Sequence, residues 1–190
     1  MGHSSDRSCL LHRNFADMLA MRGCAMATSP LSSSVIALWL LPREPAATFC
    51  RQTIERLARQ YDAPVFVPHL TLGVVDDPPR SLENTLREAI QLRPCGVFWS
   101  PFYTKTLFVR FQMTPALQTL RQSLGLGGQY DPHLSLLYHD LPAEEKARLA
   151  SSLKLSFPIA EFDRPVAVRC ANPTTSRADI EAWQTLLKDV

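Results

Sequence analysis

Hydrophobic positions along the chain fall into two spacings, one typical of strands and the other typical of helices. A nearly continuous apolar run over residues 35–41, stopped by Pro42, predicts a buried strand. Residues 45–61 then carry apolar side chains at helical spacing, and Pro45 stands at the favoured first position of a helix. We therefore expect the folded part of the chain to begin with a strand followed by an amphipathic helix.

The same two spacings, separated by turn residues, predict the remaining elements. Further strands are expected at residues 66–75, 97–103, 106–112, 157–162 and 166–170, and helices at 81–92, 114–124 and 142–153. Residues 180–187 are compatible with either a helix or a final strand. This order implies an α+β protein of two similar lobes, each an antiparallel sheet with outer helices, and a cleft between the lobes.

One five-residue pattern occurs twice in the chain, each time in a short apolar segment that reads as a strand. Residues 68–72 and 132–136 both follow Pro-His-Leu-(Thr/Ser)-Leu. Because side chains alternate between the faces of a strand, the imidazole and the hydroxyl of each copy share one face. The leucines are expected to enter the core and the polar side chains a cleft. These polar side chains are His69, Thr71, His133 and Ser135.

Two imidazoles and two hydroxyls facing a common point suit chemistry at a phosphodiester. In an in-line displacement at phosphorus, one imidazole can take the proton of the attacking group and the other can protonate the departing oxygen. The hydroxyls can donate to the non-bridging oxygens, where negative charge must be held. A single histidine in an apolar strand is more often structural, but a duplicated pattern in a chain with 5 histidines favours a catalytic pair.

Paired His-x-(Thr/Ser)-x motifs resemble the signature of the two-histidine phosphoesterase superfamily. The run Pro-His-Leu-Ser-Leu-Leu-Tyr-His-Asp-Leu-Pro-Ala-Glu-Glu-Lys at residues 132–146 is similar to its cyclic phosphodiesterase branch, known from plants and yeast. Residues 37–42 resemble the first strand of that branch, and the likeness extends from Val35 to the C-terminus. The resemblance implies a bilobal, internally duplicated fold. It also favours a final strand that contains Trp183 and pairs with residues 166–170.

The resemblance implies roles for further residues. It makes Tyr138 a substrate contact and places Trp39 near the nucleoside, although both are also compatible with core positions. Tyr138 lies five residues after His133, so it can reach the cleft only past the end of the strand or across a bulge. The resemblance further suggests that His133 activates water and that His69 protonates the leaving sugar oxygen.

Composition narrows the setting in which the protein is expected to act. With 46% hydrophobic and 20% charged residues and a net charge of +2, the chain has the composition of a globular protein. The small net charge argues against electrostatic binding of long nucleic acid and suits a small anionic substrate. The 5 cysteines are scattered and form no Cys-x-x-Cys, and no apolar run has the length of a membrane span. We expect a cytoplasmic monomer with no membrane partner.

The chain is expected to consist of an extension and one domain. Residues 1–33 are predicted to form a flexible N-terminal extension, in which charged residues interrupt any core of a signal peptide. Residues 34–190 are predicted to form a single bilobal domain. Met26 is an alternative start of the protein.

The sequence-based hypothesis is a cyclic phosphodiesterase. We expect it to open a nucleoside 2′,3′-cyclic phosphate or ADP-ribose 1″,2″-cyclic phosphate with water, using His69 and His133 as acid and base. Thr71 and Ser135 would hold the phosphoryl oxygens. The motifs carry hydroxyls where metal sites carry carboxylates, so no metal or cofactor is expected.

Two alternatives stay open at this point. An enzyme of the same superfamily can act on RNA 3′ ends, either as a phosphodiesterase or as a ligase. A non-catalytic module that binds nucleotides or RNA would contain the same motif residues, so only an activity assay separates it from an enzyme. A serine hydrolase is disfavoured because the chain has no Gly-x-Ser-x-Gly elbow.

Overall fold

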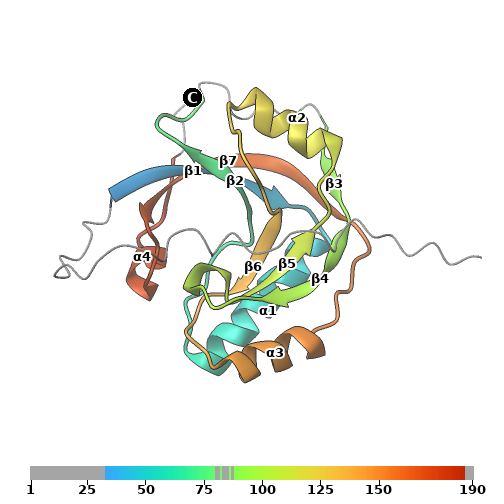
Figure 1. Cartoon of the computed structure of the whole chain (residues 1–190), viewed down its shortest axis with the longest axis vertical. Helices are drawn as coiled ribbons and strands as arrows, with labels where there is room; N and C mark the ends of the chain where they lie inside the picture. Colours follow the sequence, from blue (N-terminus) through green and yellow to red (C-terminus); the bar gives the residue numbers. More distant parts are fainter. Residues whose placement is uncertain (1–32, 80–81, 83–85, 87, 187–190) are drawn as a thin grey trace, which may run out of the picture.

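The protein has an α+β fold built on an antiparallel sheet, seen in a computed structural model that describes residues 33–79, 82, 86 and 88–186 (Figure 1). Its strands are β1 (Ser33–Pro42), β2 (Leu70–Val75), β3 (Ile90–Leu92), β4 (Pro94–Trp99), β5 (Leu107–Phe111), β6 (His133–Leu137), β7 (Ala160–Asn172) and β8 (Gln184–Thr185). The α-helices are α1 (Ala46–Tyr61), α2 (Pro115–Ser123), α3 (Ala143–Ser152) and α4 (Arg177–Glu181), and a 3₁₀ turn, η4, spans Tyr103–Lys105. The predicted extension, residues 1–33, lies outside the described residues except for Ser33, which begins β1.

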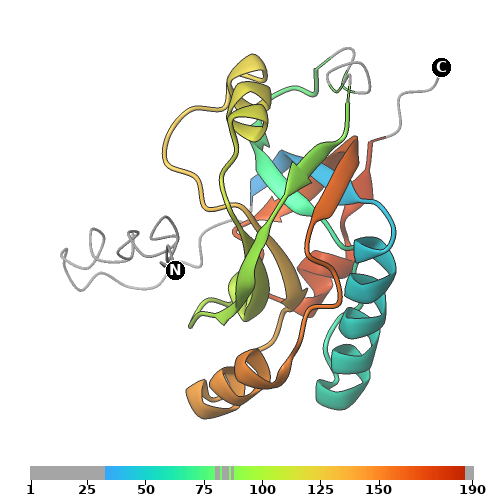
Figure 2. The same ribbon diagram turned by 90° about the vertical axis from the view of Figure 1, so that its right-hand side faces the viewer.

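The strands belong to one strongly curved sheet that is nearly barrel-shaped (Figures 1 and 2). Among the described residues the order is β3-β7-β1-β2-β6-β5-β4, and β8 pairs with β7. The prediction of two separate sheets therefore does not match this part of the chain, because the two motif strands β2 and β6 pair with each other. That junction is narrow, since the pairing consists of Leu70 opposite Leu134. The bilobal duplication is not confirmed by this topology and stays a prediction.

The two motif strands share an irregularity that the sequence does not display. Each carries one extra residue relative to its neighbouring strand, Leu72 in β2 against β1 and Leu136 in β6 against β5. Bulges of this kind bend a strand and redirect the side chains beside them. The repeat of the motif therefore extends from residue types to backbone geometry, and in both copies the bulge directly follows the hydroxyl residue.

The motif leucines lie in the core, as predicted. Leu70, Leu72, Leu134 and Leu136 are all at most 1% exposed. The core is closed by helices, with α1 and α3 lying near each other at one end of the molecule and α2 at the other (Figure 2). Thr114 begins α2 as its N-cap, where its hydroxyl accepts a hydrogen bond from the Leu117 N–H. No helix in the described part of the chain is long and apolar enough to cross a membrane.

The predicted helix over residues 81–92 is wrong at its C-terminal end. Residues 90–92 form strand β3, which pairs with residues 160–162 of β7. An amphipathic pattern is a weak preference, and strand pairing with a distant segment overrides it here. Residues 80–81, 83–85 and 87, which include the first part of the predicted helix, lie outside the described residues.

The C-terminal part differs from the prediction in two ways. The strands predicted at 157–162 and 166–170 are one strand, β7, which pairs with β1 along almost its whole length. Pro165 is tolerated because it lies between the segments that pair with β3 and β8, where one edge of β7 has no strand partner among the described residues. Beyond β7 the chain forms the short helix α4 and then β8. Residues 180–187, for which the sequence allowed a helix or a strand, thus contain the end of a helix and a short strand. Trp183 lies one residue before β8.

Candidate active site

One cavity of about 330 Å³ brings together every site residue predicted from the sequence. A volume of this size lies at the lower end of the usual range for small-molecule sites. The predicted residues on its wall are Trp39, His69, Thr71, His133, Ser135 and Tyr138. The structure thus gathers side chains from β1, β2 and β6 at one point, and their roles in catalysis and binding stay predictions.

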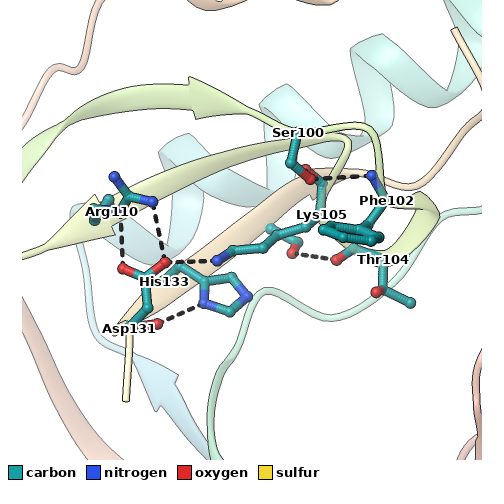
Figure 3. A network of polar contacts seen from close by, with 8 residues as sticks. Ser100, Phe102, Thr104, Lys105, Arg110, Asp131 and His133 are labelled. Carbon is teal, nitrogen blue, oxygen red and sulfur yellow. Dashed lines mark hydrogen bonds and ion pairs between the residues drawn. The ribbon is translucent and has the colours of Figure 1, made fainter. Parts of the chain in front are cut away.

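The two imidazoles are held in the same way. Nδ1 of His69 lies 2.7 Å from the main-chain oxygen of Val67, and Nδ1 of His133 lies 2.7 Å from that of Asp131 (Figure 3). A carbonyl oxygen can only accept, so each Nδ1 carries the proton and donates it. In the neutral ring, Nε2 is then left with a free lone pair and can accept a proton from another group. Each motif therefore fixes the tautomer that a general base needs.

The surroundings of His69 are aromatic. Its ring stacks on Trp39 with a centroid distance of 3.6 Å and an interplanar angle of 10°. Trp183 meets it edge-on at 5.6 Å, and Phe66 does so at 6.3 Å. This packing leaves His69 only 5% exposed.

The surroundings of His133 are charged. Phe108 packs edge-on against its ring at 5.4 Å, and the ion pairs of Lys105 and Arg110 with Asp131 lie beside it (Figure 3). Two nearly identical motifs thus place their histidines in different electrostatic environments.

Both histidines are expected to be neutral in the unliganded protein at neutral pH. Burial lowers the pKa of His69 to about 4, against the opposing effect of the Val67 carbonyl. Burial likewise lowers the pKa of His133 to about 4, and the positive charge of Lys105 adds to this. An anionic phosphate bound between the two rings would raise both pKa values, because it stabilises the protonated form.

The hydroxyl of Ser135 is already engaged in the unliganded site. It donates to the main-chain oxygen of Thr104 at 3.2 Å. Tyr138 lies one residue beyond the end of β6 and after its bulge, which is how it reaches the cavity despite its odd offset from His133. Burial raises the pKa of the Tyr138 phenol, so it keeps its proton and can donate.

Trp39 lies both in the protein core and on the wall of the cavity, the two positions that the sequence analysis considered for it. The side chain is 5% exposed and packs in a small apolar cluster with Ala37 and Val168. Its ring also forms part of the cavity wall and stacks on His69. A contact with a nucleoside stays a prediction.

Several residues of the cavity wall were not selected from the sequence. Trp183 packs edge-on against Trp39 at 5.0 Å, although the sequence indicated only a final strand around it. Thr104 and the end of β7 with the following turn, residues 170–174, also line the cavity, as do the apolar side chains of Val35, Ala37 and Val74. No spacing or motif connects these positions with the histidines, so the sequence carries no signal for them.

A second, larger hollow of about 560 Å³ lies between α1 and the end of α3. It is lined by side chains such as Phe49, Arg56 and Lys154 and contains none of the predicted site residues. We assign the candidate site to the smaller cavity because it holds both imidazoles. Among the residues that the structure describes, no three His, Cys, Asp or Glu side chains are grouped as metal ligands.

Two His-x-(Thr/Ser) strands that present their imidazoles to one cavity are the arrangement expected of a two-histidine phosphoesterase. The chain matches no protein-family model. It is 26% identical over 172 residues to a protein of Arabidopsis thaliana named cyclic phosphodiesterase, in a match that covers 82% of this chain and 94% of the relative. This similarity supports the cyclic phosphodiesterase-like family of two-histidine phosphoesterases, and the family resemblance predicted from the motifs is confirmed.

Proposed function

We propose that this protein is a metal-independent phosphodiesterase that opens a cyclic phosphate of a nucleotide to a phosphomonoester. The observation that carries the proposal is the pair of imidazoles in one cavity, each with Nδ1 bound to a carbonyl and Nε2 left for proton transfer. The similarity to a cyclic phosphodiesterase supports hydrolysis of cyclic phosphodiesters in general. The substrates we propose are nucleoside 2′,3′-cyclic phosphates or ADP-ribose 1″,2″-cyclic phosphate.

In the proposed reaction, water attacks phosphorus opposite the ribose oxygen that leaves. One imidazole takes the proton of the water as the new P–O bond forms, and the other protonates the ribose oxygen as its bond to phosphorus breaks. The hydroxyls of Thr71 and Ser135 donate to the non-bridging oxygens, where charge grows in the transition state. At the end of the reaction the proton has moved from one histidine to the other, and exchange with solvent restores the starting state.

The different surroundings of the two histidines support His133 as the base and His69 as the acid. A nearby Lys105 cation disfavours the protonated form of His133, as a base requires. His69 lies against the face of Trp39, which attracts a cation. Bound phosphate would supply the further stabilisation that protonated His69 needs, since burial alone lowers its pKa to about 4.

A substrate panel with and without chelator tests the proposed function. We expect purified protein to convert nucleoside 2′,3′-cyclic monophosphates or ADP-ribose 1″,2″-cyclic phosphate to phosphomonoesters, detected by ³¹P NMR, with an unchanged rate after exhaustive EDTA treatment. The control is a variant in which both His69 and His133 are replaced by alanine, prepared in parallel. Loss of activity on chelation and its return with a divalent ion would contradict the mechanism. Turnover restricted to a cyclic-phosphate-ended RNA would indicate the RNA-end enzyme, and binding without turnover would indicate the binding module.

Removal of the motif hydroxyls is expected to weaken transition-state stabilisation. Thr71→Val and Ser135→Ala should each lower kcat/KM by about 10–10³, because each removes a donor to developing charge. Ser135 must turn away from the Thr104 oxygen to serve the substrate, so we expect Ser135→Ala to have the smaller effect of the two. Thr53→Val, which removes a buried hydroxyl in α1 outside the cavity, is the matched control. The measurement is kcat and KM from steady-state kinetics. A rise in KM at constant kcat would contradict the prediction, because it would mean that the hydroxyls bind the substrate and the transition state equally well.

A further inference from the structure

Three charged side chains from separate parts of the chain form an ion cluster beside the second motif (Figure 3). Nζ of Lys105, at the end of η4, lies 2.6 Å from Oδ2 of Asp131. Nε of Arg110, in β5, lies 2.8 Å from Oδ1 of Asp131, and a terminal nitrogen of Arg110 donates to Oδ2 at 3.1 Å. The three side chains are 23%, 32% and 37% exposed for Lys105, Arg110 and Asp131, so solvent screens them less than ion pairs on the open surface.

This cluster is connected directly to His133. The main-chain oxygen of Asp131, whose carboxylate holds both cations, is the acceptor for Nδ1 of His133. Arg110 is the residue paired with His133 across the β5–β6 ladder. Lys105 Nζ lies 4.7 Å above the ring of Phe108, which packs edge-on against His133. The cluster therefore reaches His133 through the Asp131 carbonyl, through the strand pairing with Arg110 and through the ring of Phe108.

The first motif has no equivalent of this arrangement. The residue that corresponds to Asp131 is Val67, whose main-chain oxygen holds His69 at the same 2.7 Å distance. Val67 is apolar and 56% exposed, so its side chain cannot form an ion pair. The carbonyl contact is therefore possible without the cluster. The charges beside His133 instead give its ring an electrostatic environment that His69 does not have.

We propose that Lys105, Arg110 and Asp131 are positioning residues for His133, which add to burial and, through their net positive charge of +1, further favour the neutral form of its ring. The inference rests on the proposed function, in which His133 is the base and must be neutral to accept the proton of water. Lys105 and Arg110 supply two positive charges and Asp131 one negative charge, so the cluster as a whole repels a proton on the adjacent ring.

The directions of the individual effects make this proposal specific. Besides burial, the charge of Lys105 lowers the pKa of His133, the carbonyl and charge of Asp131 raise it, and Arg110 lowers it. The His69 ring lines the same cavity, and positive charge on one of the two histidines disfavours protonation of the other. Partial burial opposes ionisation of Asp131, but the hydrogen bond and charge of Lys105, followed by those of Arg110, hold the pKa of its carboxyl below the ordinary value. Asp131 is therefore charged at neutral pH. Removal of the Lys105 charge should raise the pKa of His133, whereas removal of the Asp131 charge should lower it.

An NMR titration of the histidine ring nitrogens tests the proposal without any need for turnover. Lys105→Met should raise the pKa of His133 by roughly one pH unit, and Asp131→Asn should keep the ring neutral to lower pH than in the wild type. Lys105→Arg retains the charge and should restore wild-type titration. Arg148→Met removes one positive charge from an ion pair with Glu145 on α3 and is the matched control, which should leave His133 unchanged.

Activity supplies the second measurement. Because the base must be neutral, the acidic limb of the kcat/KM profile should move to higher pH in Lys105→Met and to lower pH in Asp131→Asn. Should Lys105→Met fail to fold, as judged by circular dichroism, Lys105→Gln replaces it as the uncharged variant. An unchanged His133 titration in both cluster variants, or shifts in the same direction, would refute this proposal. Absence of hydrolysis by the wild type would instead refute the proposed function, which makes the two failures distinguishable.

Discussion

Replacement of either His69 or His133 by alanine is expected to lower kcat by about 10²–10⁴, the usual contribution of one general acid or base. Each ring has its Nδ1 bound to a carbonyl, so only Nε2 can exchange a proton with substrate or water in the cavity. Alanine removes that atom and leaves no nearby group in the same place. The measurement is kcat from saturating steady-state kinetics with a cyclic nucleotide.

Stability must be followed together with activity, and here the structure changes the expectation. The sequence placed both rings in a cleft, and a ring that only faces a cleft could be removed with little effect on folding. His69 is instead buried, stacked on Trp39 and packed edge-on against Trp183, so His69→Ala also leaves a void and should lower the free energy of unfolding. His69→Gln fills more of that space and separates the two effects.

A third histidine provides the control for these variants. His139 follows the second motif but does not line the cavity, and His139→Ala should retain wild-type kcat. Thermal unfolding of every variant shows whether the protein that is assayed is folded. Near-wild-type turnover by a folded variant at position 69 or 133 would remove that residue from catalysis.

A substrate with sulfur at the cleaved bond is expected to rescue the acid variant selectively. A ribose oxygen leaves poorly unless it is protonated, so loss of the acid should raise the barrier by about 3–5 kcal/mol. A bridging sulfur leaves as a thiolate and needs little help from an acid, whereas the attacking water still needs its base. His69→Ala should therefore regain much of its lost rate on the sulfur substrate, while His133→Ala should stay slow.

This experiment decides the assignment that nearly identical motifs leave open. The measurement is the ratio of rates on the sulfur and oxygen substrates for each variant, with the wild type as reference. The reverse pattern would exchange the two roles. Equal slowness of both variants on sulfur would mean that the histidines do not transfer a proton to the leaving group.

Local features of the fold could be read from the sequence because their causes are local. Helix α1 starts one residue after the predicted position and ends at the predicted Tyr61, since side-chain periodicity and Pro45 act within one segment. The same holds for α2, which begins after the Thr114 cap, and for α3. Strand alternation likewise placed the motif leucines in the core and the polar pairs on the opposite face.

Elements that depend on a distant partner could not be read in this way. Residues 90–92 carry a helical pattern but pair with β7, and β7 continues through Pro165 because β1 supports it on one edge. Pairing between segments that lie far apart in the chain leaves no signal in either segment alone. For the same reason the sequence predicted two sheets, whereas the pair Leu70–Leu134 joins the motif strands within one.

The sequence by itself determined the two histidines and the two hydroxyl residues of the candidate site, because the motif specifies both the residue types and the face of the strand on which they stand. The tertiary structure alone decided how the two copies differ. Trp39 and Trp183 surround His69, while Lys105, Arg110 and Asp131 border His133. A pKa depends on burial and on charges within a few ångströms, whichever part of the chain supplies them. Two motifs that are almost the same in sequence can therefore hold histidines with different roles only after the chain has folded.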